Sequence, residues 1–155
     1  MELYIVRHGQ SFNNALEGTN GERVCDPPLT GVGETQAKLI ATHLKSNIEK
    51  SGNVEKTGFG ITRIFCSAML RALQTTAPIA ESLEIHPEVW IDVHEQGGIW
   101  LEDREVQSPR EYPGLTRREI EERFPEYLLP REITDEGWWN RPAEVPEQWI
   151  SRADR

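Results

Sequence analysis

The chain has 155 residues, of which 37% are hydrophobic and 28% charged, a balance typical of one soluble globular domain. Its 26 acidic and 17 basic side chains give a formal net charge of −9, which argues against nucleic acid and anionic membranes as partners. An anionic substrate must therefore be held by a local group of arginines, because the overall field of the protein repels it.

The first predicted element is a buried strand over residues 3–6, and Arg7, His8 and Gly9 follow it directly. In open α/β sheets, ligands bind at the carboxyl ends of strands, and a glycine there lets a ligand approach the backbone closely. The same tripeptide also suits an ordinary exit from a strand into a loop, so its interpretation depends on the rest of the chain.

Helices and strands then alternate along the chain. The predicted elements are a helix that follows Thr30 and extends to Ile48, a strand over residues 61–66, a helix over 69–83 that is interrupted or restarted at Pro78, and a strand over 89–93. This order of strand, helix, strand, helix and strand predicts an α/β fold with a parallel sheet.

The remainder of the chain has a different character, with prolines, glycines and acidic residues around several tryptophans. Thr116 and Glu119 form a capping-box pattern that opens a short helix ending before Pro125, and residues 144–155 also have a helical pattern. We expect the tryptophans of this part to pack as a cover over the sheet edge; they are Trp100, Trp138, Trp139 and Trp149.

Two further side chains are expected near His8. Arg71 follows the second predicted strand, which puts it at the same sheet edge if both strands lie in one parallel sheet. Arginines beside a histidine are typical of an oxyanion site, because guanidinium groups hold phosphate oxygens in bidentate geometry. Glu95 closes the third predicted strand and can protonate a leaving oxygen if burial keeps it protonated. The alternatives are a surface helix position for Arg71 and a solvated strand end for Glu95.

Three segments together resemble the histidine phosphatase superfamily, also called the phosphoglycerate mutase-like family. They are residues 3–11, the pattern Leu29-Thr30-x-x-Gly33-x-x-Gln36-Ala37, and residues 67–75. The resemblance covers residues 1–100 and implies a three-layer αβα fold with a mostly parallel central sheet. It also implies one histidine phosphatase domain over residues 1–155, in which residues 96–149 form a lid or insertion.

The same resemblance implies a chemical role for each residue of the site. His8 would be the nucleophile, attacking phosphorus in line to form a phosphohistidine intermediate. Arg7, Arg71 and Asn14 would contact the phosphoryl oxygens, and Glu95 matches the family's proton donor by its position after the third strand. This chemistry requires no metal and no cofactor.

The family has a second catalytic histidine, usually followed by glycine, on a later strand. The other histidines here are His43, His86 and His94, and none of them follows a strand in the required order. We therefore expect that the C-terminal strand or strands carrying this histidine are missing and that the chain is an N-terminal fragment. An unpaired sheet surface predicts poor stability or self-association, together with weak or no phosphatase activity.

Phosphomonoester hydrolysis is the predicted function, with a phosphorylated small molecule or a phosphoprotein as substrate. One alternative is phosphoglycerate mutase-type phosphoryl transfer, and another is a catalytically silent phosphate-binding or interaction module, because the second histidine is absent. Neither Cys25 nor Cys66 has metal-ligand or disulfide spacing, and no second histidine follows His94 at the spacing of a zinc protease. Without a targeting segment or a long apolar stretch, we expect a cytoplasmic protein with reduced thiols.

Overall fold

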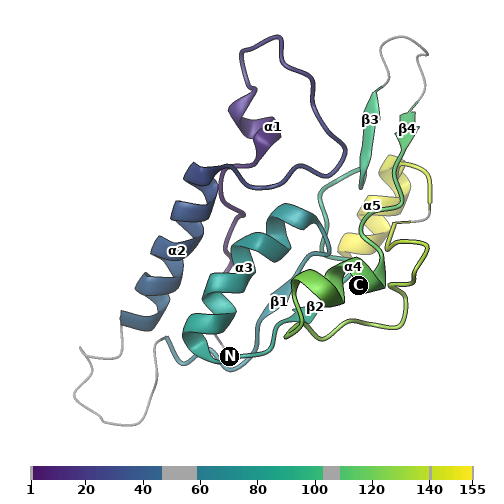
Figure 1. Ribbon diagram of the computed structural model, residues 1–155. Coiled ribbons are helices and arrows are strands. Elements are labelled where there is room, and N and C mark those ends of the chain that lie inside the picture. The colour runs from purple at the N-terminus through teal and green to yellow at the C-terminus, as the bar shows by residue number, and fades with distance from the viewer. Residues whose placement is uncertain (1, 47–58, 103–108, 140, 155) are drawn as a thin grey trace.

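The computed structural model describes residues 2–46, 59–102, 109–139 and 141–154 (Figure 1). The helices are α1 (Phe12–Ala15), α2 (Gly31–Ser46), α3 (Leu70–Leu83), α4 (Arg117–Arg123) and α5 (Pro146–Ala153). The strands are β1 (Phe65–Cys66), β2 (Glu88–Val89), β3 (Trp100–Glu102) and β4 (Pro109–Glu111). None of the described helices is long and apolar enough to cross a membrane.

β1 and β2 form a parallel pair in which Phe65 lies opposite Glu88. Helix α3 connects the two strands, so the predicted strand–helix–strand unit with parallel strands is confirmed. Both strands are shorter than predicted. Residues 61–64 of the first predicted strand lie in the loop before β1, and residues 90–93 of the second form a loop with a turn after β2.

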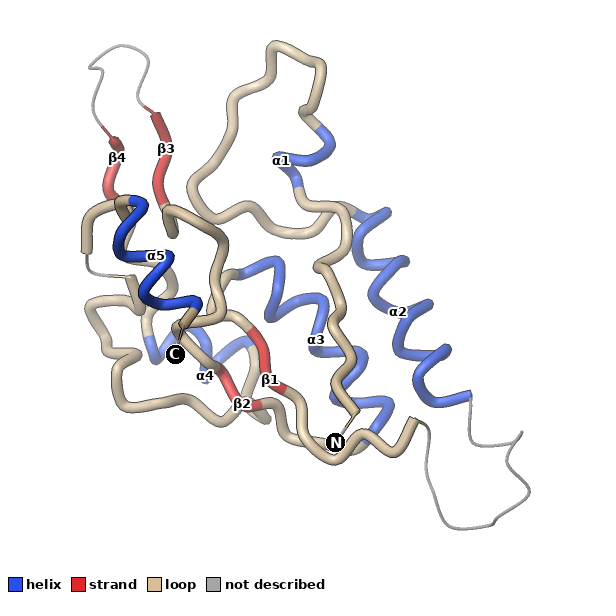
Figure 2. Tube along the Cα trace, turned by 180° about the vertical axis from the view of Figure 1, so that it is seen from behind, coloured by secondary structure: helices blue, strands red, loops and turns tan. Residues whose placement is uncertain are grey.

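The predicted strand over residues 3–6 is wrong for the described structure, in which this segment is a loop. Leu3 and Ile5 are 77% and 88% exposed, and no described segment pairs with their backbone. A strand exists only where a neighbouring backbone completes its hydrogen bonds, so an apolar pattern alone does not produce one. Figure 2 shows this loop leading past α2 and α3 to α1.

Helices α2 and α3 lie side by side (Figure 1) and bury Ala41, Leu44 and Ile79 between them. The predicted helix after Thr30 is therefore confirmed as far as Ser46, and the two residues to its expected end lie outside the described ranges. Packing of one helix on the other sets the position of α3, which carries Arg71.

The predicted interruption of the second helix at Pro78 is wrong. α3 continues through this residue to Leu83 and ends at Glu84, whose φ of 56° is left-handed. A proline removes one helical hydrogen bond, but buried side chains on both sides of it, Leu73 and Ile79, hold the helix against the rest of the protein.

The larger core joins the parallel pair, α3 and the C-terminal part of the chain. Its buried side chains are Cys66, Ala68, Met69, Leu70, Leu73, Val89, Ile99, Leu115, Ile120, Tyr127, Ile133, Trp138 and Trp139. Residues 96–149, predicted as a lid, thus contribute to the same core as the first hundred residues. Their action as a lid stays a prediction.

Two of the C-terminal elements follow their sequence signals. α4 begins at a capping box, in which the Thr116 hydroxyl accepts the Glu119 N–H and the Glu119 carboxylate accepts the Thr116 N–H. α5 begins at Pro146, within the segment predicted to be helical. The antiparallel hairpin of β3 and β4 has no counterpart among the predicted elements, because its strands are short and rich in charged residues.

Candidate active site

The loop that carries His8 is fastened to the start of α2. The Gln10 carbonyl accepts the Thr30 N–H at 3.0 Å, and the Gln10 N–H donates to the Gln36 side-chain oxygen at 2.8 Å. Thr30 and Gln36 belong to the sequence pattern that runs from Leu29 to Ala37. In the structure, these two residues of the pattern hold the His8 loop against α2.

Gly9 and Gly33 allow the same two segments to approach closely. A Cβ on Gly9 would lie 2.5 Å from the Gly33 carbonyl oxygen, and a Cβ on Gly33 would overlap the Gln10 carbonyl oxygen. Any larger residue at either glycine would push the His8 loop away from α2.

Helix α3 is tied to the same loop. The Gly9 N–H donates to the Thr75 hydroxyl at 3.1 Å, and that hydroxyl donates to the Arg71 carbonyl at 2.7 Å. The Gln74 side-chain oxygen accepts the Leu29 N–H at 2.8 Å. The backbone beside His8 and the helix turn that carries Arg71 are therefore one connected unit.

His8 is half-buried, and its Nδ1 lies 2.7 Å from the Gly9 carbonyl oxygen. Because a carbonyl oxygen can only accept a hydrogen bond, Nδ1 carries the proton of the neutral ring and the lone pair is on Nε2. Burial lowers the pKa of His8, and the charges of Arg71 and Arg7 lower it further against the opposing effect of the Gly9 hydrogen bond. The ring is thus held neutral, as a nucleophile requires.

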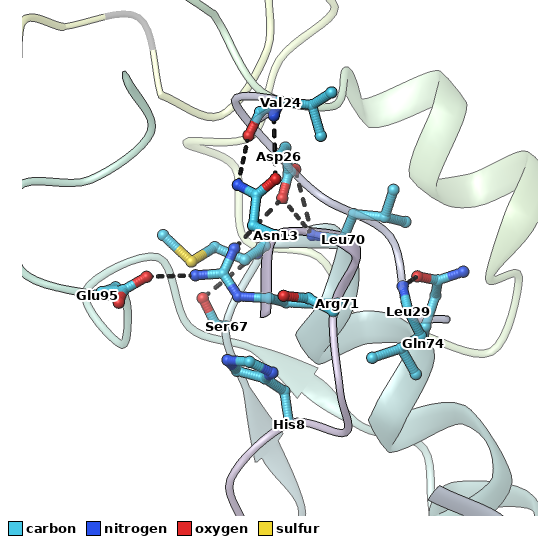
Figure 3. Close-up of polar contacts among 12 residues, drawn as sticks. His8, Asn13, Val24, Asp26, Leu29, Ser67, Leu70, Arg71, Gln74 and Glu95 are labelled. Atoms are coloured by element: carbon cyan, nitrogen blue, oxygen red, sulfur yellow. Dashed lines mark hydrogen bonds and ion pairs between the residues drawn. The ribbon is translucent and has the colours of Figure 1, made fainter. Parts of the chain in front are cut away.

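The Arg71 side chain is only 8% exposed and extends from the first turn of α3 toward His8 and Glu95 (Figure 3). Its Nη2 lies 2.6 Å from Oε2 of Glu95, whose own side chain is 70% exposed. The structure thus brings His8, Arg71 and Glu95 together. Glu95 reaches the site from a loop and not from the end of a strand, as β2 ends at Val89.

Asp26 belongs to this site and was not among the residues predicted for it. Its carboxylate accepts the Leu70 N–H at 3.0 and 3.2 Å, and its Oδ1 lies 3.9 Å from Nη1 of Arg71 (Figure 3). Burial raises the pKa of Asp26 to about 6, against the opposing effects of the Leu70 hydrogen bond and Arg71. The one feature of the sequence that could have indicated Asp26 is its position directly before Pro27 and Pro28, which lead into the pattern that begins at Leu29.

Arg7 and Asn14 were also predicted to bind phosphate. Arg7 is exposed, directly beside His8, and its charge acts on the His8 ring. Asn14 lies in α1, where its side-chain oxygen accepts the N–H and the hydroxyl of Ser11 at 3.2 and 2.9 Å. Phosphate contacts from these two residues stay predictions.

The other histidines have surroundings of their own. His43 on α2 makes a ring contact with Phe59, and Nδ1 of His86 lies 3.0 Å from the Glu126 carboxylate. The His94 side chain is fully buried, with Nε2 lying 3.2 Å from the Glu144 carboxylate. Each of them is thus engaged with a group other than His8.

Within the described ranges, no three histidine, cysteine, aspartate or glutamate side chains are placed to hold a metal ion together. The arrangement places together the Arg71 guanidinium, the neutral His8 imidazole with an available lone pair, and the Glu95 carboxylate. A guanidinium is suited to an oxyanion and a neutral imidazole to nucleophilic attack.

Comparison with known sequences gives consistent results. The model of the histidine phosphatase superfamily (branch 1) matches residues 3–155. A protein described as a probable phosphoglycerate mutase GpmB from Yersinia enterocolitica is 35% identical over 108 residues, covering 70% of this chain and 44% of that protein. Its counterpart of the same description from Escherichia coli is 29% identical over 140 residues, covering 87% of this chain and 59% of that protein.

A solved structure is also similar. The ecdysone phosphate phosphatase EPPase from Bombix mori, in complex with tungstate, superposes with a TM-score of 0.57 at 14% identity, over 95% of this chain and 61% of that one. At this identity the likeness shows a shared fold. The chain spans 44% and 59% of the length of the two curated relatives.

Proposed function

This chain belongs to branch 1 of the histidine phosphatase superfamily, and from that premise we propose that it hydrolyses phosphomonoesters through a phosphohistidine on His8. The observation that carries the proposal is the neutral His8 ring, with its lone pair on Nε2, beside the guanidinium of Arg71. The three-layer αβα arrangement with a mostly parallel sheet is part of the proposal, supported by the parallel pair and the similar solved structure.

In the first step, Nε2 of His8 attacks phosphorus and the bond from phosphorus to the leaving oxygen breaks. Glu95 takes up a proton when the substrate displaces it from Arg71 and gives that proton to the leaving oxygen, so the product leaves as a neutral alcohol or phenol. Arg71 and Arg7 neutralise the charge on the transferred phosphoryl oxygens, which is the main demand of this reaction on a protein.

In the second step, a water molecule attacks the phosphohistidine. The Glu95 carboxylate accepts a proton from this water, the bond from phosphorus to Nε2 breaks, and inorganic phosphate leaves. His8 returns to its neutral form with the proton still on Nδ1, because the Gly9 carbonyl holds it there throughout. Glu95 is then protonated again, as it was at the start of the first step, and His8 is neutral.

The acceptor of the phosphoryl group separates the proposed hydrolysis from mutase activity, in which a second position on the substrate takes the place of water. We propose water as the acceptor and a phosphorylated small molecule or phosphoprotein as the substrate. The net charge of −9 favours such a ligand in a local arginine site over any nucleic acid partner. We also propose a cytoplasmic location.

A silent phosphate-binding module is the second candidate, and one observation favours it. His43, His86 and His94 have partners other than His8, and among the described residues the structure shows no contact between the His8 ring and another imidazole. In such a module, Arg71 and His8 would hold phosphate without transferring it.

Release of para-nitrophenol from para-nitrophenyl phosphate, together with tungstate affinity, tests these proposals. For His8→Ala we expect a loss of turnover on the order of 10³-fold, because the atom that forms the covalent intermediate is gone. His86→Ala, which changes an exposed histidine, should leave turnover unchanged.

Equal turnover by the His8→Ala variant would rule out His8 as the nucleophile. Tungstate binding by the unaltered protein without any turnover would instead favour the silent module. Turnover together with phosphoryl transfer to a second hydroxyl of a phosphoglycerate substrate would favour the mutase.

A further inference from the structure

Residues of the α5 region reach back to the segment that carries Glu95. The Arg152 Nη1 donates to the Asp92 carbonyl at 2.8 Å and lies 3.4 Å from the His94 carbonyl oxygen, which also accepts from it. The other edge of the guanidinium makes a bidentate pair with Glu144, at 3.0 Å from Nε and 2.8 Å from Nη2. One arginine thus joins a glutamate to two carbonyl groups just before Glu95.

Glu144 holds the same segment at one more place, where its backbone N–H donates to the Gly97 carbonyl at 3.1 Å. The buried His94 ring adds a contact within the segment, since its Nδ1 lies 2.7 Å from the Ile91 carbonyl oxygen. Hydrogen bonds from Arg152 and Glu144 therefore hold the backbone of residues 91–97 both before and after Glu95.

These contacts are shielded from water. The side chains of Glu144 and Arg152 are only 7% and 11% exposed, and the His94 ring packs edge-on against Trp139 at a centroid distance of 4.9 Å. Hydrogen bonds from Arg152 lower the pKa of Glu144, so the pair stays ionised. An ion pair in such surroundings is stronger and more directional than one at the surface.

Apart from its pair with Arg71, the Glu95 side chain has no further partner among the described residues. Glu95 lies in a loop with a largely exposed side chain, and two turns flank it, closed by the Val93 N–H to the Trp90 carbonyl and by the Gly98 N–H to the Glu95 carbonyl. The position of its carboxylate relative to Arg71 therefore depends on what anchors the neighbouring backbone.

We propose that Glu144 and Arg152 form a clamp that positions Glu95 for proton transfer to the leaving group. This inference rests on the proposed hydrolysis and deepens it by assigning two positioning residues outside the site. Both act through the backbone of residues 91–97 and neither touches the substrate.

The test compares two substrates that differ in their need for a proton. The leaving group of para-nitrophenyl phosphate departs readily as an anion, whereas that of benzyl phosphate must be protonated. For Arg152→Met we expect kcat/KM for benzyl phosphate to fall by about 10- to 100-fold, part of what a general acid supplies. For para-nitrophenyl phosphate the change should stay within about threefold.

Arg118→Met is the matched control, because Arg118 also pairs with a glutamate, Glu122, but at 81% exposure on α4. It should change neither rate. Glu144→Gln keeps the size of the side chain and weakens the pair, so it should show the same selectivity in milder form. In a Glu95→Gln background, Arg152→Met should add no further loss on benzyl phosphate, since the group being positioned is already gone.

Hydrogen exchange gives a readout that does not need turnover. Amides of residues 92–98 should exchange about tenfold faster in Arg152→Met, and not in Arg118→Met, if the clamp holds this segment. Unchanged exchange there would overturn the proposal, as would equal loss on both substrates. If the unaltered protein hydrolyses neither substrate, the proposed hydrolysis fails, and the exchange result alone decides whether the clamp exists.

Discussion

Arg71 is the residue on which the site depends, and two very different carboxylates face it. Glu95 is exposed and lies 2.6 Å from the guanidinium, whereas the Asp26 side chain is 2% exposed and lies 3.9 Å away. Asp26 also accepts the N–H of Leu70, the first residue of α3. The buried carboxylate thus fixes the start of the helix from which Arg71 extends.

Asp26 predicts a specific pH dependence of stability. Its pKa is raised from 3.8 to about 6 in the folded protein, so the folded state holds this proton more tightly than the unfolded state does. The stabilisation is complete below the unfolded value and is lost as the pH rises through 6, by about 3 kcal/mol in all. Asp26→Asn keeps an oxygen for Leu70 but has no proton to lose.

The free energy of unfolding of Asp26→Asn, measured in urea, should therefore rise relative to that of the unaltered protein between pH 4 and pH 7. The difference should approach about 3 kcal/mol. Asp135→Asn, at an exposed position, serves as control. Parallel pH profiles for Asp26→Asn and the unaltered protein would contradict the prediction.

Among the elements, α2 has the contact that most directly shapes the site. Gly33 in its first turn lies against the backbone of Gly9 and Gln10, whereas Gly31, two residues earlier, has no neighbour within 4 Å of where a Cβ would be. Of the two glycines in this helix turn, Gly31 has room for a side chain and Gly33 does not.

Substitution of each glycine by alanine should separate these roles. Gly33→Ala should destabilise the protein by about 1–3 kcal/mol, because its Cβ overlaps the Gln10 carbonyl, and turnover should fall as the His8 loop shifts. Gly31→Ala should be neutral or stabilising by up to about 1 kcal/mol. Thermal unfolding and para-nitrophenyl phosphate turnover measure both, and similar effects of the two changes would argue against the close contact.

The helices could be predicted from the sequence more completely than the strands. Apolar spacing located α2 and α3, and the Thr116 capping box located α4, because helical hydrogen bonds and caps join residues close in sequence. Strands depend on partners far away in the chain. Residues 3–6 therefore form no strand despite their pattern, and the hairpin of β3 and β4 escaped prediction.

The candidate site follows the same division. Arg71 was expected near His8 because both were predicted to follow strands of one parallel sheet. The two residues do lie together, but residues 3–6 form no strand, and the hydrogen bonds of Gly9 to Thr75 and of Thr30 to Gln10 hold the His8 loop in place instead. Asp26, Glu144 and Arg152 could not be found in this way, because they act by contacts across 44 to 60 positions of the chain. Such contacts depend on the path of the loops, which no local pattern specifies.

At the scale of the whole molecule, a strongly acidic chain leaves an apolar segment exposed at its N-terminal end. Within the described ranges, the backbone of residues 3–6 has no paired strand, and Leu3 and Ile5 project into solvent. Unpaired extended backbone with apolar side chains is a template for pairing with another chain. We propose that a second copy of this protein fills that place.

The unaltered protein should therefore show a sedimentation coefficient that increases with concentration. Ile5→Pro should suppress this increase, because proline removes a backbone donor and Ile5 is too exposed for its side chain to matter to folding. Ile5→Thr keeps the donor and a β-branched side chain, and should retain most of the association. A monomer at all concentrations, or equal association of the proline variant, would contradict the proposal.

Because Arg71 is already paired with Glu95, we expect an anion that binds Arg71 to replace the Glu95 carboxylate as its counter-ion. An entering anion meets a guanidinium that already has a negative partner at 2.6 Å, so its affinity is the difference between two ion pairs and not the full strength of one. A ligand with a single negative charge gains little by such an exchange. A phosphate monoester, which carries nearly two, gains more, so we expect the proposed site to discriminate against sulfate monoesters of the same shape.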